Sequence, residues 1–207
     1  MSLRTKLILG GLAAAAIALG AQAAAPAAGP SKDPKTVQAG KYVLEPLHAQ
    51  ILFSVSHMGL STWYGDFHNA SGTLQIDPAK PAAAMVEINI PTNSVNTIND
   101  TLNTELKSPA WLDPAKYPTI TFKSTKVTPT GAGKADVTGN LTFHGVTKPM
   151  TLKVSFLAAG TNAMNKKFTA GFEASGSFKR SDFGVKTYLP MIGDDINLMI
   201  SAPFERN

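Results

Sequence analysis

Apolar and polar side chains alternate with a period of two along most of the chain beyond Gly40. Leu152, Val154 and Phe156, for example, alternate with Lys153 and Ser155. Neighbouring residues of a strand point to opposite faces, so the pattern predicts half-buried strands of an antiparallel sheet. The segments with this pattern are 51–57, 86–90, 120–123, 135–143, 152–156, 168–178 and 196–202.

The connections between these segments are short and contain glycine. Thr130–Gly133 and His144–Val146 both read as hairpin turns, because glycine adopts the positive φ that such turns require. Sequential strands joined by tight turns form a meander, and a meander of this many strands must close or leave exposed edges. The sequence therefore predicts an all-β, antiparallel, up-and-down barrel.

One segment, between Ser94 and Lys107, breaks the alternation. Ile98, Leu102 and Leu106 recur every four residues, which predicts a short amphipathic helix. Ser94 is the expected N-cap, and Pro109 prevents extension. The apolar stripe of this helix is expected to cover a flank or an open end of the barrel.

The long segment 168–178 raises the question of what fills the barrel. Small residues such as Ala174 and Gly176 share a face with Phe172 and Phe178. An eight-stranded barrel is either filled by its side chains or holds one small ligand, and the sequence leaves both alternatives open. If there is a cavity, we expect ten inward residues to contact the ligand: Phe53, Val55, Ile88, Phe122, Leu141, Phe143, Val154, Phe172, Phe178 and Leu198.

Arg180–Gly184 follows this long strand and is the candidate rim of the cavity. We expect Arg180 and Asp182 to contact a polar head group at the mouth. The alternative is structural: Arg180 pairs with Asp182 or with backbone carbonyls.

The first residues have the three parts of a secretory signal. Arg4 and Lys6 precede the apolar run 7–19, and Ala21–Ala23 supplies small residues for cleavage near Ala23. The apolar run is short for a bilayer-spanning helix, although an N-terminal anchor is the alternative. We expect a signal peptide at 1–23, a flexible linker at 24–38, one barrel domain at 39–207, and an exported protein.

The charge and the reactive residues exclude several classes of function. Without the signal, the chain has 17 basic and 14 acidic residues, which gives a net charge of +3, and the basic residues are scattered along the sequence. Nucleic-acid binding is therefore not expected. The chain has no cysteine, hence neither disulfides nor lipidation at cysteine.

Nothing in the sequence supports catalysis or a metal site. Adjacent Asp194 and Asp195 on a strand would face opposite sides, which makes them a poor acid–base pair. His57 and His68 could meet if their strands pair, but a structural role for each is the simpler interpretation. We expect neither catalytic residues nor a bound metal.

Six stretches of the chain, in order, resemble the YceI-like family of periplasmic, lipocalin-fold, polyisoprenoid-binding proteins. The most distinctive is the hairpin Gly139-Asn-Leu-Thr-Phe-His-Gly-Val-Thr-Lys-Pro149, and the resemblance covers residues 41–204. The others are Tyr42–Gly59, Trp63–Phe67 with Ser71–Gly72, Leu106–Asp113, Tyr117–Ser124 and Arg180–Gly184.

The resemblance implies a lipocalin-like barrel of about eight strands with a short helical insertion, and a bound polyisoprenoid or isoprenoid quinone. It implies no cofactor and no enzymatic activity. A membrane cytochrome of the b561 type is a conceivable partner, and the oligomeric state is open, with a homodimer among the alternatives. The chain departs from the family at Leu102-Asn103 and Glu105-Leu106, where many relatives carry Arg-Asp and His-Leu. Two other functions remain: a ligand-free, stress-related structural or interaction protein, and a carrier that delivers quinone to the cytochrome.

Overall fold

The computed structural model describes residues 29–207, which form eleven β-strands, one α-helix and several short 3-10 turns. The helix α1 spans Asp100–Leu106. The strands are β1 (Gly40–Leu44), β2 (Gln50–His57), β3 (Ser61–Phe67), β4 (Ser71–Ile76), β5 (Met85–Pro91), β6 (Val95–Asn96), β7 (Thr119–Gly131), β8 (Lys134–Phe143), β9 (Val146–Thr161), β10 (Phe168–Lys179) and β11 (Asp195–Arg206).

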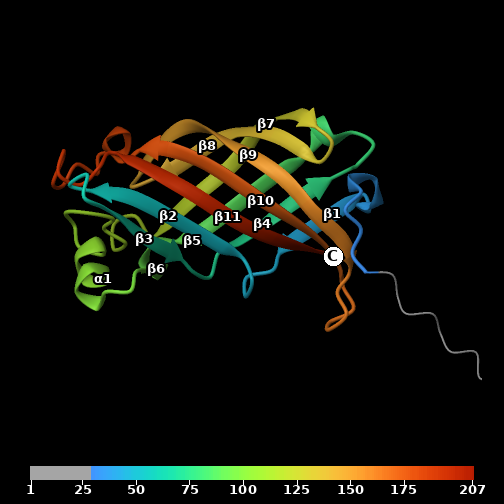
Figure 1. The fold of residues 1–207 in the computed structure, drawn as a ribbon, viewed down its shortest axis with the longest axis horizontal. Coiled ribbons are helices and arrows are strands. Elements are labelled where there is room, and N and C mark those ends of the chain that lie inside the picture. The colour runs from blue at the N-terminus through green and yellow to red at the C-terminus, as the bar shows by residue number, and fades with distance from the viewer. Residues whose placement is uncertain (1–28) are drawn as a thin grey trace, which may run out of the picture.

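These strands form one closed antiparallel barrel (Figure 1). Strand β1 pairs with both β4 and β11, which closes the ring. Strands β1 and β2 pair with successive parts of β11, so together they occupy one position in the wall. Strands β3 and β4 likewise share one position, because β3 pairs with β2 and β4 pairs with β1. Strands β5 and β6 share the next position, because β5 pairs with β4 and β6 pairs with β3. The barrel therefore has eight wall positions, as predicted, and belongs to the lipocalin-like class.

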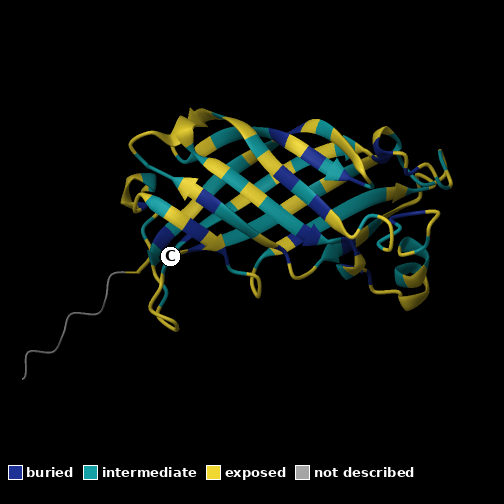
Figure 2. Cartoon of the chain, turned by 180° about the vertical axis from the view of Figure 1, so that it is seen from behind, coloured by how far each residue is buried: buried dark blue, intermediate teal, exposed yellow. Residues whose placement is uncertain are grey.

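The burial of the wall follows the alternation seen in the sequence. Figure 2 shows exposed and less exposed residues succeeding one another along the strands. In β8, Val137, Gly139, Leu141 and Phe143 are buried, whereas their neighbours are not. The strands predicted from the period are confirmed, but β7 and β9 extend five to eight residues beyond the predicted segments. The two predicted hairpins are confirmed as well; His144 (φ 49°) and Gly145 (φ 75°) both adopt positive φ.

The short helix is confirmed, but it begins later than predicted. Ser94 ends a 3-10 turn, and its Oγ donates to the carbonyl of Pro91, so it is not the N-cap. The N-cap is Asn99, whose side chain accepts a hydrogen bond from the Leu102 N–H at 3.0 Å. The cause is β6, which pairs with β3 and keeps the preceding residues extended. No helix within residues 29–207 is long and apolar enough to cross a bilayer.

Residues 29–38 were expected to be part of a flexible linker, and this expectation is wrong for most of them. The backbone of Ser31 exchanges two hydrogen bonds with that of Ala159, at 2.8 and 2.9 Å. Asp33 caps a 3-10 turn at Pro34–Thr36, and Val37 is buried. Burial of Val37 and pairing with β9 hold this segment on the barrel. The expected signal peptide and the start of the linker lie outside the described residues.

Candidate functional site

The barrel encloses two cavities rather than a filled core. The helix-side cavity has a volume of about 390 Å³ and is lined by residues of β2, β3, β8, β10, α1 and the loops around α1. The far cavity has a volume of about 510 Å³ and extends toward the opposite end, where residues 33–35 and 129–134 line it. Both volumes fall in the range of small-molecule sites.

The two cavities meet at an aliphatic waist inside the barrel. Ile51, Ile90, Leu141 and Leu198 line both of them. The cavities therefore adjoin along the barrel axis at these four residues.

Small residues in the wall make room for this interior. Gly65 on β3 pairs with Phe53 on β2, and a Cβ at Gly65 would overlap the Phe53 ring. The Phe53 ring thus occupies the space that a side chain at Gly65 would need. Ala174 lines the far cavity between larger side chains, as the cavity hypothesis required.

The structure places eleven of the twelve predicted ligand-contacting residues around the cavities. Phe53, Val55, Phe143, Phe178 and Arg180 line the helix-side cavity; Ile88, Phe122, Val154 and Phe172 line the far cavity; Leu141 and Leu198 line both. Asp182 lines neither. Its carboxylate pairs with Lys148 at 3.1 Å on the outer surface.

Arg180 has a structural role in addition to its place in the cavity wall. Its side chain is buried, and its Nε, Nη1 and Nη2 atoms donate to the carbonyls of Gly193, Val185 and Ile192 at 2.8, 3.1 and 2.8 Å. Its guanidinium also lies 5.2 Å from the centre of the Trp111 ring. Burial lowers the pKa of Arg180, and nearby Asp194 opposes this shift. Arg180 thus ties the loop 185–193 to the end of β10.

Asp194 fixes the same turn from the other side. Its carboxylate accepts hydrogen bonds from the backbone N–H and the hydroxyl of Ser181, at 2.8 and 2.7 Å. Burial alone would raise the pKa of Asp194, but the two hydrogen bonds from Ser181, together with the charges of Lys179 and Arg180, outweigh it, and the pKa lies below its ordinary value. The turn after β10 is consequently held by two charged groups with defined partners.

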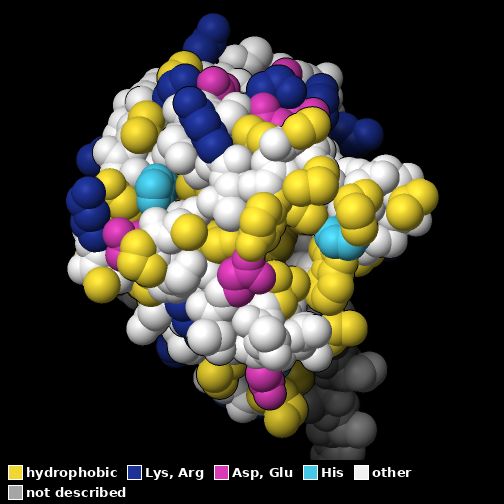
Figure 3. All heavy atoms as spheres, turned by 90° about the vertical axis from the view of Figure 1, so that its left-hand side faces the viewer, with side chains coloured by type: hydrophobic (Ala, Val, Ile, Leu, Met, Phe, Trp, Pro, Cys, Tyr) yellow, Lys and Arg dark blue, Asp and Glu magenta, His cyan; other side chains and the backbone are white. Residues whose placement is uncertain are grey.

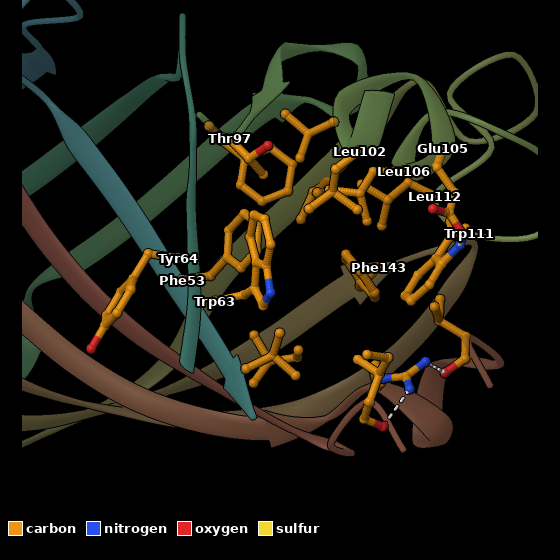
Figure 4. Close-up of a pocket in the computed structure, with 18 of the residues that line it drawn as sticks. Phe53, Trp63, Tyr64, Thr97, Leu102, Glu105, Leu106, Trp111, Leu112 and Phe143 are labelled. Atoms are coloured by element: carbon orange, nitrogen blue, oxygen red, sulfur yellow. Dashed lines mark hydrogen bonds between the residues drawn. The ribbon is translucent and has the colours of Figure 1, made fainter. Parts of the chain in front are cut away.

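The helix-side end contributes several lining residues that are not among the twelve predicted ligand contacts. Trp63, Leu102, Leu106, Trp111 and Glu105 come from β3, α1 and the segment that follows (Figure 4). Glu105 Oε1 accepts a hydrogen bond from Trp111 Nε1 at 3.2 Å. The signal in the sequence was the apolar stripe of the helix, which does cover an end of the barrel.

Exposed hydrophobic side chains surround the helix-side mouth. Met58 and Leu60 lie at the β2–β3 turn, Ile98 precedes α1, and Tyr188 and Met191 lie in the loop before β11; all are more than half exposed. Figure 3 shows hydrophobic side chains gathered around a hollow at this end. The mouth is therefore apolar outside as well as inside.

The two histidines considered as metal ligands do not meet. In the β2–β3 register His57 pairs with Ser61, whereas His68 follows Phe67, the partner of Ile51. The two side chains therefore lie at opposite ends of this hairpin. Within residues 29–207, no three His, Asp or Glu side chains group in a way that could hold a metal.

The chain matches the model of the YceI-like domain over residues 42–204. It is 40% identical to protein YceI of Escherichia coli over 158 residues, which cover 76% of this chain and 82% of that protein. Among solved structures, a Campylobacter jejuni YCEI protein is 31% identical with a TM-score of 0.65, covering 73% of this chain and 90% of that one. A polyisoprenoid binding domain from Saccharophagus degradans shares the fold at 16% identity and a TM-score of 0.62, covering 82% of this chain and all of that one. These matches confirm the resemblance seen in the sequence: the chain belongs to the YceI-like family.

Proposed function

We propose that the protein is a periplasmic binding protein that sequesters or carries one polyisoprenoid or isoprenoid quinone inside its barrel. The observation that carries the proposal is the pair of apolar cavities adjoining at the aliphatic waist. A chain of isoprene units is long, apolar and flexible, which suits a long interior of this kind. The related barrel described as a polyisoprenoid binding domain supports the same ligand class.

The energetics favour retention of a long chain over a short one. Each buried CH₂ group contributes about 0.8 kcal/mol. Association costs on the order of 4–15 kcal/mol in lost freedom. Several isoprene units that lie across the waist would offset this cost, so affinity is expected to rise with chain length until both cavities are filled. The proposal assigns no catalytic step to the protein.

The first test is native mass spectrometry of the full protein purified from the periplasm of its own host. Organic extraction and lipid identification follow. A stoichiometric isoprenoid supports the proposal, and the same spectra give the oligomeric state, including any homodimer. A protein that is empty and also refuses added quinones and prenyl alcohols contradicts it, and favours the ligand-free structural role. Recovery in the cytoplasm with an uncleaved N-terminus contradicts the periplasmic part.

Delivery of a quinone to a membrane cytochrome of the b561 type is the second candidate function. The exposed hydrophobic ring of Met58, Leu60, Ile98, Tyr188 and Met191 favours a role in which the mouth meets an apolar surface. The test is the rate of quinone reduction in membranes from a deletion strain, with and without added protein. An unchanged rate contradicts delivery but leaves the binding role intact.

A further inference from the structure

Among residues 29–207, Glu105 is the one acidic residue that lines the helix-side cavity. Its Oε1 accepts the hydrogen bond from the Trp111 indole, which holds the carboxylate beside the cavity (Figure 4). Within residues 29–207, no Lys, Arg or His nitrogen lies within ion-pairing distance of this carboxylate, and Trp111 is the one donor recorded for it. Glu105 Oε2 therefore retains its capacity to accept a hydrogen bond from a ligand.

Thr97 and Asn99, two other polar residues that line this cavity, are already engaged in holding the fold. The hydroxyl and backbone N–H of Thr97 both donate to Asn103 Oδ1, at 2.8 and 2.6 Å. The side chain of Asn99 caps α1. These groups fix the helix and the loop before it.

The cationic side of the cavity is engaged as well. The guanidinium of Arg180 donates to three backbone carbonyls and has almost no exposed surface. Three of its five N–H donors are therefore used, and a phosphate head would have to enter a nearly closed site to reach the other two. His57 is the other basic group in the lining, and its ring packs against Trp63 with the centroids 6.3 Å apart.

We propose that Glu105 selects the head group of the bound isoprenoid. Its carboxylate accepts a hydrogen bond from a neutral hydroxyl, so the protein favours prenyl alcohols and hydroquinones over prenyl phosphates. This inference rests on the proposed function, since it needs an isoprenoid in the barrel. An ionised carboxylate is an acceptor only, and its hydrogen bonds are about twice as strong as neutral ones. An anionic head beside this carboxylate meets electrostatic repulsion.

The experiment compares three probes with one chain and different heads: farnesol, farnesyl methyl ether and farnesyl phosphate. They compete, at equal concentrations, for delipidated full-length mature protein, and native mass spectrometry gives the bound ratios. We expect farnesol to outcompete both other probes by about tenfold, the value of one charge-assisted hydrogen bond. The ether lacks the donor, and the phosphate carries the charge.

The variant Glu105→Gln removes the charge and keeps an oxygen for the Trp111 indole. In this variant the preference for farnesol over the phosphate is expected to fall about threefold, which corresponds to about half of the expected free-energy difference. The matched control is Glu87→Gln, an outward carboxylate 3.4 Å from Lys123, which should leave the ratios unchanged. Ratios that are the same in Glu105→Gln and the unmodified protein overturn the inference. Equal binding of the three probes also overturns the inference, but it leaves the proposed function intact. If no probe binds, the proposed function itself is contradicted.

Discussion

The two halves of the barrel interior differ in chemistry. The helix-side cavity is lined by both tryptophans, Trp63 and Trp111, together with Glu105 and Arg180. The far cavity is lined mainly by aliphatic side chains and phenylalanines, with the charged residues Asp33, Lys35 and Lys134 near its outer end. A barrel with one polar, aromatic half and one aliphatic half suits an amphiphile held in a single orientation. We expect the head on the helix side and the tail beyond the waist.

The two halves also differ in how their ends are held. At the helix-side end, Arg180 and Asp194 bind loop carbonyls, a backbone N–H and a hydroxyl. At the far end, strand pairing and the bridge between Ser31 and Ala159 hold the chain. The first arrangement depends on a few charged side chains, and the second on distributed backbone bonds. Single substitutions should therefore have larger effects at the helix-side end, except where they fill the cavity.

The largest effect is expected from Ala174→Trp, which fills the far cavity. The tail of a long prenyl chain would lose its site, so affinity for octaprenol should fall about 100-fold, while farnesol on the helix side binds nearly unchanged. Competition binding with the two alcohols measures this. Ser175→Phe, on the next and outward-facing position, is the control for added bulk. Equal loss of both ligands, without a change in thermal stability, would contradict the assignment of tail and head to the two halves.

Arg180→Lys should destabilise the helix-side end most. The guanidinium donates to three backbone carbonyls, and a lysine ammonium at this position would not reach all of them. Each buried carbonyl left without a donor costs about 1–3 kcal/mol. We expect the free energy of unfolding to fall by about 2–4 kcal/mol in urea titrations. Arg206→Lys is the control at the far end, where exposed Arg206 bonds Gln38 and Ala39. A stable Arg180→Lys that no longer binds ligand would instead make Arg180 a head-group contact.

Gly65→Ala should have an intermediate effect. The new Cβ would overlap the Phe53 ring and approach the Asn96 carbonyl, so Phe53 must move into the helix-side cavity. We expect a loss of about 1–3 kcal/mol in the free energy of unfolding and weaker farnesol binding. Gly171→Ala, in the far half, has no atom nearer than 3.8 Å to the added Cβ and should be close to neutral. Farnesol binding that survives Gly65→Ala would show that this ring does not border the ligand.

The smallest effect is the acid sensitivity that comes from Asp194. Because its pKa is lowered in the folded protein, its contribution to stability is complete above the ordinary aspartate pKa of about 4, and is lost as pH falls through the lowered value. Asp194→Asn should therefore be less stable than the unmodified protein at neutral pH, and the difference should shrink in strong acid. Urea titrations at both pH values measure it. The adjacent Asp195→Asn is the control, since Asp195 makes an exposed pair with Lys179. If Asp194→Asn is less stable than the unmodified protein by the same amount at both pH values, the charge of Asp194 is not the cause of the lost stability.

Much of the wall was predictable because burial in a barrel repeats every second residue. The period identified β8, β10 and β11, and the glycine turns identified the hairpins between β7, β8 and β9. Strand β3 did not show the alternation of apolar and polar residues, because the neighbouring Trp63 and Tyr64 place an aromatic side chain on each face of the strand. The N-cap of α1 was misplaced because β6 keeps the preceding residues extended through its pairing with β3.

The sequence by itself determined the antiparallel barrel and the inward faces of the alternating strands, because these follow from local alternation and turn chemistry; the number of about eight strands came from the resemblance to the family. It also indicated the family through ordered motifs. Only the tertiary structure decided that the interior is open, that Arg180 is engaged with carbonyls, and that Glu105 lies beside a cavity. These properties depend on distances between segments far apart in the chain. The volume left inside a closed wall depends on how side chains from many strands pack against one another, which no single segment specifies.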